Sequence, residues 1–160
     1  MKRKNIVEIT PSKINLNEVA ESVGDDGSGA TSLFVGTTRD NFKGKFVKRL
    51  EYEAYESMAI KEVKRVIVEA RKKWNLFHVA VHHRTGVVPV RETSIVIAVS
   101  SAHRKDSLEA VQYLIDTIKA TVPIWKKEVY SDGTSWKENA ESRGDAVVGK
   151  TLNSSTRSTK

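Results

Sequence analysis

The sequence predicts an α+β domain in which helices pack against a mixed β-sheet. Two long segments carry apolar residues at the helical period, and shorter segments rich in β-branched residues lie between and after them. The length of 160 residues fits one domain, and a hydrophobic fraction of 39% is enough for a core. We place this domain at residues 1–140 and expect the polar residues 141–160 to be a disordered tail.

The helices are predicted from apolar stripes and from their end signals. The first long helix follows Glu56, and its stripe consists of Ala59, Val63, Val66, Ile67, Ala70 and Trp74. The second runs over 105–121 until Pro123 ends it, with a buried face expected at Leu108, Val111, Ile115, Ile118 and Val122. A shorter helix is expected over 16–23, because Asn15 and Glu18 have the spacing of a capping box.

The expected strands are short and are separated by turn residues. They lie at residues 5–10, 31–37, 46–55, 78–85, 94–101, 124–131 and 134–138. The strand at 31–37 has the apolar run of a buried strand. Asp132-Gly133, between the last two strands, is the strongest short hairpin signal in the chain.

The net charge of +7 and the pI near 9.6 have two interpretations. The excess is either a solvated surface or the sign of an anionic partner, such as a phosphate ligand, an acidic protein or a nucleic acid. The absence of cysteine excludes disulfides, thiolate metal sites and a cysteine nucleophile. No apolar run approaches the roughly 20 residues of a membrane span, and the basic start is too short for a secretory signal, so we expect a cytosolic protein.

The first candidate for a binding site is the end of the strand at 31–37. Thr37, Thr38 and Arg39 follow Gly36 there. Glycine lets a ligand approach the backbone, hydroxyls donate hydrogen bonds, and arginine can hold a phosphate through two hydrogen bonds. An ordinary exit from strand to loop is the alternative explanation.

The second candidate is the junction of strand and helix at His103 and Arg104. Free backbone N–H groups at a helix start favour anions, and both side chains add donors. The alternative is a capped and solvated turn, with Asp106 or Ser107 as the cap.

The third candidate is a group of lysines around Pro123. Lys119 lies at the edge of the helix's buried stripe, and Lys126 shares a strand face with Glu128, opposite Lys127. Partly buried lysines can act as acids or bases because burial lowers their pKa. Lysines that merely extend to solvent beside a core are the alternative.

Three histidines fall on the strand at 78–85. His78 and His82 would point to one side and lie about 13 Å apart along the strand, too far to share a metal without a bend, and His83 follows them. We expect them at the surface or on an edge strand, and we expect neither a metal nor another cofactor on this chain.

Five motifs in order resemble the large, catalytic subunit of molybdopterin synthase in its eukaryotic form. They are Leu33–Arg39, Leu50–Tyr55, His82–Gly86, Ser100–Arg104 and Lys119–Glu128. The resemblance covers residues 5–140 and not the tail. It implies an α/β hammerhead fold with an additional antiparallel β subdomain.

The resemblance also implies a sulphurtransferase of molybdenum cofactor biosynthesis. Its substrate would be cyclic pyranopterin monophosphate, which gains two sulphurs to become molybdopterin. The sulphur would arrive as a thiocarboxylate on the C-terminal Gly-Gly of a ubiquitin-like small subunit. A homodimer of this chain would form the centre of a heterotetramer, with no nucleic acid and no membrane involved.

The resemblance implies roles for particular residues. Lys119 and Lys126 would be catalytic. The substrate-binding set would be Thr37, Thr38, Arg39, His103, Arg104, Lys119, Lys126, Lys127 and Glu128. A basic nucleic-acid-binding domain and a scaffold that only docks a ubiquitin-like protein are the alternative functions; a scaffold would tolerate loss of Lys119.

Overall fold

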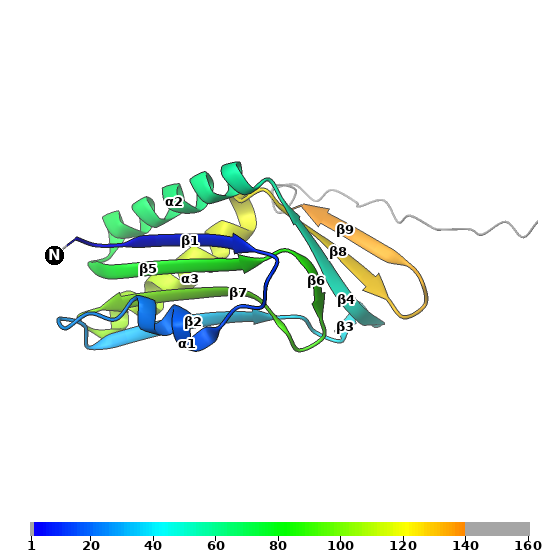
Figure 1. Ribbon diagram of the computed structural model, residues 1–160, viewed down its shortest axis with the longest axis horizontal. Helices are drawn as coiled ribbons and strands as arrows, with labels where there is room; N and C mark the ends of the chain where they lie inside the picture. The colour runs from blue at the N-terminus through cyan, green and yellow to red at the C-terminus, as the bar shows by residue number, and fades with distance from the viewer. Residues whose placement is uncertain (1, 140–160) are drawn as a thin grey trace, which may run out of the picture.

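The computed structural model describes residues 2–139, so the predicted tail lies outside the described residues (Figure 1). The elements in chain order are β1 (Asn5–Thr10), α1 (Leu16–Ser22), β2 (Ala30–Thr37), β3 (Asn41–Phe42), β4 (Lys45–Ala54), α2 (Glu56–Lys73), β5 (Leu76–Arg84), β6 (Gly86–Pro89), β7 (Thr93–Ser101), α3 (Arg104–Thr121), β8 (Ile124–Tyr130) and β9 (Ser135–Asn139). The short strands β3 and β6 were not predicted, because neither carries a run long enough to show an alternation.

The first sheet has the strand order β1-β5-β7-β2, with β1 parallel to β5 and the other pairs antiparallel. Helices α2 and α3 cover one face, and α1 covers the other (Figure 1). The main core lies under α2 and α3, where Val79 and Val81 of β5 meet Ile97 of β7. The predicted α+β class is confirmed, with helices on a mixed sheet.

The apolar stripes place the two long helices on this sheet. All the stripe residues of α2 from Ala59 to Ala70 are buried, as predicted. On α3, Ile115 and Ile118 are buried, but Leu108 is 58% exposed, so its prediction was wrong. Leu108 lies at the border of the buried face, about 80° around the helix from Ile118, which is near the centre of that face.

The second sheet is antiparallel, with the order β3-β4-β8-β9 and with β6 also paired to β4. The predicted hairpin is confirmed: β8 and β9 pair, Gly133 has a φ of +86°, and Asp132 Oδ1 accepts a hydrogen bond from the Thr134 backbone N–H at 2.8 Å. This is the additional antiparallel β subdomain that the resemblance implied.

Two strands differ from their predicted environments. Strand β2 is the last strand of the first sheet, and only Ser32 in it is buried, so the prediction of a buried strand was wrong. Strand β5 lies between β1 and β7, and His78 and His83 are 4% and 8% exposed, so the edge-strand prediction was also wrong. The N-terminal strand β1 pairs in parallel with β5, so β5 is not an edge strand. No local pattern in the sequence of β5 predicts this pairing.

Candidate active-site pocket

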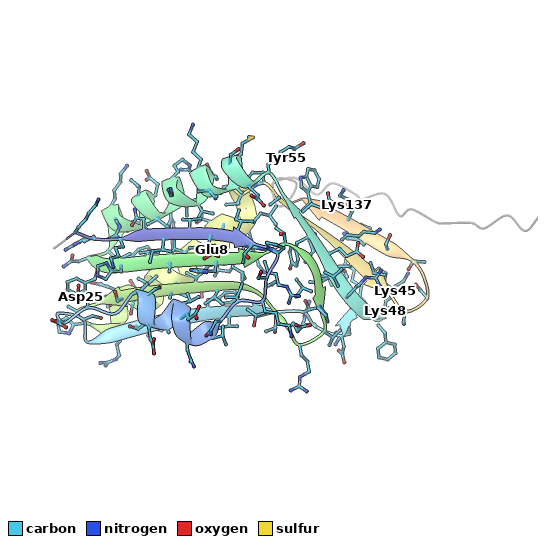
Figure 2. All side chains as sticks on the ribbon, in the orientation of Figure 1. Glu8, Asp25, Lys45, Lys48, Tyr55 and Lys137 are labelled. Atoms are coloured by element: carbon cyan, nitrogen blue, oxygen red, sulfur yellow. The ribbon has the colours of Figure 1, made fainter. Side chains whose placement is uncertain are left out.

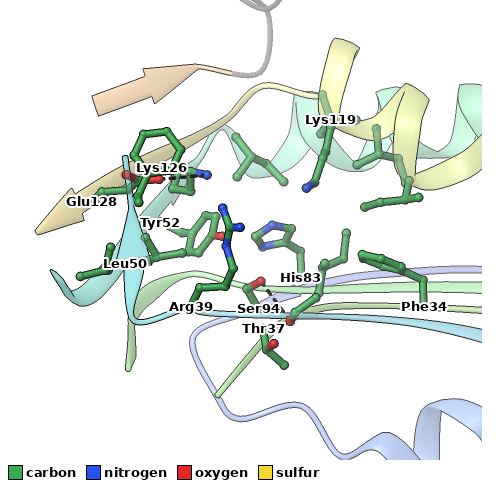
Figure 3. Close-up of a pocket in the computed structure, with 18 of the residues that line it drawn as sticks. Phe34, Thr37, Arg39, Leu50, Tyr52, His83, Ser94, Lys119, Lys126 and Glu128 are labelled. Carbon is green, nitrogen blue, oxygen red and sulfur yellow. Dashed lines mark hydrogen bonds and ion pairs between the residues drawn. The ribbon is translucent and has the colours of Figure 1, made fainter. Parts of the chain in front are cut away.

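A cavity of about 260 Å³ opens where the two sheets meet the C-terminal end of α3 (Figure 3). Its walls come from β2, β3, β4, the end of β5, the start of β7, α3 and β8. The lining residues are Phe34, Gly36, Thr37, Arg39, Asn41, Phe42, Val47, Leu50, Tyr52, His83, Ser94, Ile95, Ile115, Ile118, Lys119, Val122, Ile124, Lys126 and Glu128. Five of the predicted site residues are among them: Thr37, Arg39, Lys119, Lys126 and Glu128.

The turn at Pro123 brings the two predicted catalytic lysines to one cavity. Lys119 is in the last turn of α3, which ends at Thr121 and is capped by Val122, whose backbone N–H donates a hydrogen bond to Ile118 O. Proline cannot continue the helix, so β8 begins at once. Lys126 follows on the inner face of β8, and both lysine side chains line the cavity (Figure 3).

Lys126 belongs to a chain of polar contacts along β8. Its Nζ lies 3.4 Å from Glu128 Oε1, and Tyr130 Oη donates a hydrogen bond to Glu128 Oε2 at 2.8 Å. Glu128 is 4% exposed and Tyr130 is 7% exposed. Burial, and then the Glu128 carboxylate, raise the pKa of Tyr130 well above its usual value, so it remains a donor. Both oxygens of the Glu128 carboxylate are therefore engaged.

Arg39 reaches the cavity because the preceding residues fix the end of β2. Thr38 is buried; its hydroxyl donates to Val88 O at 3.3 Å and its backbone N–H donates to Glu92 O. A Cβ on Gly36 would lie 2.7 Å from Ile95 Cγ2, so glycine is needed for β2 to pack here. Thr38 thus holds the loop, and Arg39 projects into the cavity (Figure 3).

His83, Tyr52 and Phe34 also line the cavity, although we did not predict them as site residues. The His83 ring meets the Tyr52 ring edge-on, with centroids 4.9 Å apart. Burial lowers the pKa of His83 to about 4, so its imidazole is neutral at physiological pH. Strand alternation could have revealed it, because His83 shares a face with the core residues Val79 and Val81.

Three other predicted site residues lie away from the cavity. Lys127 is exposed on the opposite face of β8. His103 and Arg104 are exposed at the start of α3, and Arg104 is about 22 Å along that helix from Lys119. Within one chain, these two therefore cannot reach the pocket that Lys119 lines.

A second polar contact is remote from the pocket. His78 Nε2 lies 3.0 Å from Asp25 Oδ2, and the His78 Nδ1 accepts a hydrogen bond from the Lys4 backbone N–H. Figure 2 shows Asp25 at the end of the first sheet that is far from Lys45 and Lys48 of the second sheet. The Asp25–His78 contact joins the loop after α1 to β5 and contributes nothing to the pocket.

The charge of the pocket suits an anionic ligand. Arg39, Lys119 and Lys126 are cationic, Glu128 is the carboxylate among the lining residues, and His83 is neutral. Arginine and ammonium groups can bind phosphate and carboxylate oxygens, and an ammonium can stabilise negative charge that develops in a reaction. The pocket therefore has groups for binding anions and for stabilising them during chemistry.

The comparisons with known proteins agree with this chemistry. A molybdopterin synthase catalytic subunit from Taeniopygia guttata is 56% identical over 139 residues, which cover 86% of this chain and 90% of that protein. The crystal structure of molybdopterin synthase from Staphylococcus aureus has a TM-score of 0.77 at 37% identity, covering 82% of this chain and 95% of that one. A complex of subunits 1 and 2 of the molybdopterin-converting factor from Helicobacter pylori shares the fold, with a TM-score of 0.67 at 20% identity, over 86% of this chain and 91% of that one. The model of the MoaE protein family matches residues 9–121, and the chain belongs to that family.

Proposed function

We propose that this chain is the catalytic subunit of a molybdopterin synthase. It converts cyclic pyranopterin monophosphate to molybdopterin by inserting two sulphurs from a thiocarboxylated small subunit. One observation carries the proposal: Lys119 and Lys126, from two different elements, converge with Arg39 on a single cavity. The similarity to molybdopterin synthase catalytic subunits supports it.

The chemistry matches the groups in the pocket. In each transfer the sulphur of the thiocarboxylate attacks a side-chain carbon of the substrate, and an oxygen leaves that carbon. Water then hydrolyses the resulting thioester, which releases the carrier as a carboxylate and leaves the sulphur on the substrate. Each step moves a proton or negative charge, which the ammonium of Lys119 or Lys126 can stabilise. Arg39 is placed to hold the phosphate. The chain has no cysteine, which suits an enzyme whose sulphur arrives on a partner.

The small subunit must deliver a C-terminal tail to this cavity. A tail that ends in a thiocarboxylate is anionic, so the cationic lining favours its entry. The fold shared with the Helicobacter pylori complex supports a two-subunit assembly. Among residues 2–139, no helix is long and apolar enough to cross a membrane. We extend the proposal to a cytosolic location.

His103 and Arg104 serve the pocket of a second copy of this chain in our proposal. They are too far along α3 to reach their own Lys119. A homodimer at the centre of a heterotetramer would bring them to the neighbouring pocket.

The direct test is reconstitution. This protein is mixed with thiocarboxylated small subunit and cyclic pyranopterin monophosphate, and the dithiolene product is measured. If the chain is the catalytic subunit of the synthase, product forms only when all three components are present. A scaffold would bind the small subunit without forming product. A nucleic-acid-binding domain would show neither, and would instead retain RNA or DNA with a steep dependence on salt.

A further inference from the structure

We propose that His83 binds the substrate directly, with its Nε2 accepting a hydrogen bond from an N–H or O–H group. This inference rests on the proposed function, because it takes the cavity as the substrate site. The reduced pterin ring of the proposed substrate carries several N–H groups, so a site for it needs acceptors as well as cations. His83 lines the same cavity as Lys119 and Lys126 (Figure 3).

The other strong groups of the cavity are poorly suited to that role. Arginine and lysine side chains have donors and no acceptor in their charged forms. The Glu128 carboxylate could accept, but its two oxygens are engaged by Lys126 and Tyr130. An N–H group of a ligand therefore needs an uncharged acceptor, and the cavity offers His83 and the side-chain oxygens of Thr37, Asn41, Tyr52 and Ser94. The hydroxyl and amide groups can also donate, whereas Nε2 of a His83 ring protonated at Nδ1 can only accept.

The tautomer of His83 is fixed by the backbone. Its Nδ1 lies 2.8 Å from Arg84 O. A carbonyl oxygen can only accept, so Nδ1 carries the proton and donates, which leaves Nε2 with its lone pair. The edge-on contact with Tyr52, at an interplanar angle of 70°, holds the plane of the ring.

The low basicity of the His83 imidazole favours a role in substrate binding over a role in proton transfer. Burial lowers the pKa of His83 to about 4. A base this weak is far from the pKa near 7 that favours general-base catalysis at neutral pH. The ring stays neutral, keeps its acceptor and adds no charge that would compete with the cations for the anionic part of the substrate.

Two substitutions test the roles of the two ring nitrogens of His83 separately. The amide of His83→Asn can take the place of Nδ1 and keep the bond to Arg84 O, but it provides nothing at the Nε2 position. The longer His83→Gln places an amide oxygen near the Nε2 position and gives up the bond to Arg84. Arg39→Gln serves as the comparison that removes a cation and leaves His83 intact.

The experiment is calorimetric titration of each variant with cyclic pyranopterin monophosphate, and titration with inorganic phosphate followed by NMR. We expect His83→Asn to weaken substrate binding about 3- to 10-fold, the worth of one hydrogen bond. His83→Gln should recover most of that loss. Phosphate binding should be unchanged in both and weakened in Arg39→Gln. In turnover, His83→Asn should raise KM with little change in kcat.

The inference is overturned if His83→Asn binds the substrate like the wild type, or if Asn and Gln lose affinity equally, which would make the ring a packing element only. Loss of phosphate binding in His83→Asn would also contradict it, because the cation site would then be disturbed. If the wild-type protein does not bind the substrate, the proposed function fails together with the inference. If the wild-type protein binds the substrate and substitution of His83 leaves that affinity unchanged, the inference alone fails.

Discussion

The ammonium of Lys126 lies 3.4 Å from a carboxylate oxygen of Glu128, two residues further along β8. The other oxygen of Glu128 accepts a hydrogen bond from Tyr130 at 2.8 Å. Alternation along the strand puts all three side chains on the inner face. The buried Tyr130 therefore holds the Glu128 carboxylate, and that carboxylate in turn holds the ammonium of Lys126 in the pocket.

Removing the Tyr130 hydroxyl should therefore destabilise the protein. Tyr130→Phe leaves one oxygen of a buried carboxylate without its donor, which costs about 1–3 kcal/mol in the free energy of unfolding. Urea unfolding followed by circular dichroism measures this. Tyr55→Phe is the matched control, because Tyr55 is 65% exposed and its loss should change stability by less than about 0.5 kcal/mol. Equal midpoints for Tyr130→Phe and the wild type would contradict the contact.

The acid sensitivity of the fold should depend on His83. Burial lowers its folded-state pKa to about 4, from an ordinary value of 6.5. Between these pH values the unfolded chain binds a proton that the folded chain does not, so the free energy of unfolding falls as the pH falls. From pH 7 to pH 5 this amounts to roughly 2 kcal/mol.

Urea unfolding at both pH values checks this expectation. His83→Asn should lose less stability on acidification than the wild type does. His82, whose pKa is also lowered by burial, is present in both proteins and cancels from the comparison. An identical loss in wild type and variant would show that His83 titrates normally in the folded protein.

Mixed dimers test whether His103 and Arg104 act on a neighbouring pocket. Lys119→Ala and Arg104→Ala proteins, each impaired alone, are mixed and allowed to exchange subunits. If the residues act between copies, half of the dimers are mixed and each has one intact pocket, which gives about a quarter of wild-type activity. Activity no higher than that of the separate variants would place both residues in one pocket or outside it. A protein that remains monomeric at micromolar concentration in light scattering would contradict the dimer itself.

Capture of the small subunit should weaken as salt is added. Its anionic tail approaches Arg39, Lys119 and Lys126, and ionic screening reduces that attraction. We expect the Kd of the complex, measured by calorimetry, to rise several-fold between 50 and 500 mM NaCl, a range over which the Debye length falls from about 14 to about 4 Å. A constant Kd across that range would remove electrostatics from the docking step.

Local patterns predicted much of this fold. The helical stripe gave α2 its buried face, Asp132-Gly133 gave the hairpin, and alternation correctly put Lys126 and Glu128 on one side of β8. These features depend on residues that are close in sequence. Leu108 was misplaced because a stripe of five positions does not fix the centre of a helix face to better than about one residue.

The part that could not be predicted depends on contacts between distant segments. The His83 ring is buried because β1, more than 70 residues earlier, pairs with β5 and because α3 and the second sheet close over its end. Tyr52 and Phe34 reach the same cavity from β4 and β2. The end of β5, His82-His83-Arg84, is polar, so we placed His83 at the surface, although its alternation with Val79 and Val81 favoured the core face.

The central claim is that Lys119 carries out chemistry in this pocket. The measurement is dithiolene formation by Lys119→Ala with saturating thiocarboxylated small subunit and cyclic pyranopterin monophosphate. Circular dichroism and partner binding verify that the fold and the complex are intact. Lys64→Ala, an exposed lysine on α2, is the matched control and should keep wild-type activity. We predict that Lys119→Ala retains less than about a tenth of wild-type activity, a barrier increase above about 1.4 kcal/mol. A Lys119→Ala enzyme that keeps more than a tenth of wild-type activity would contradict the account.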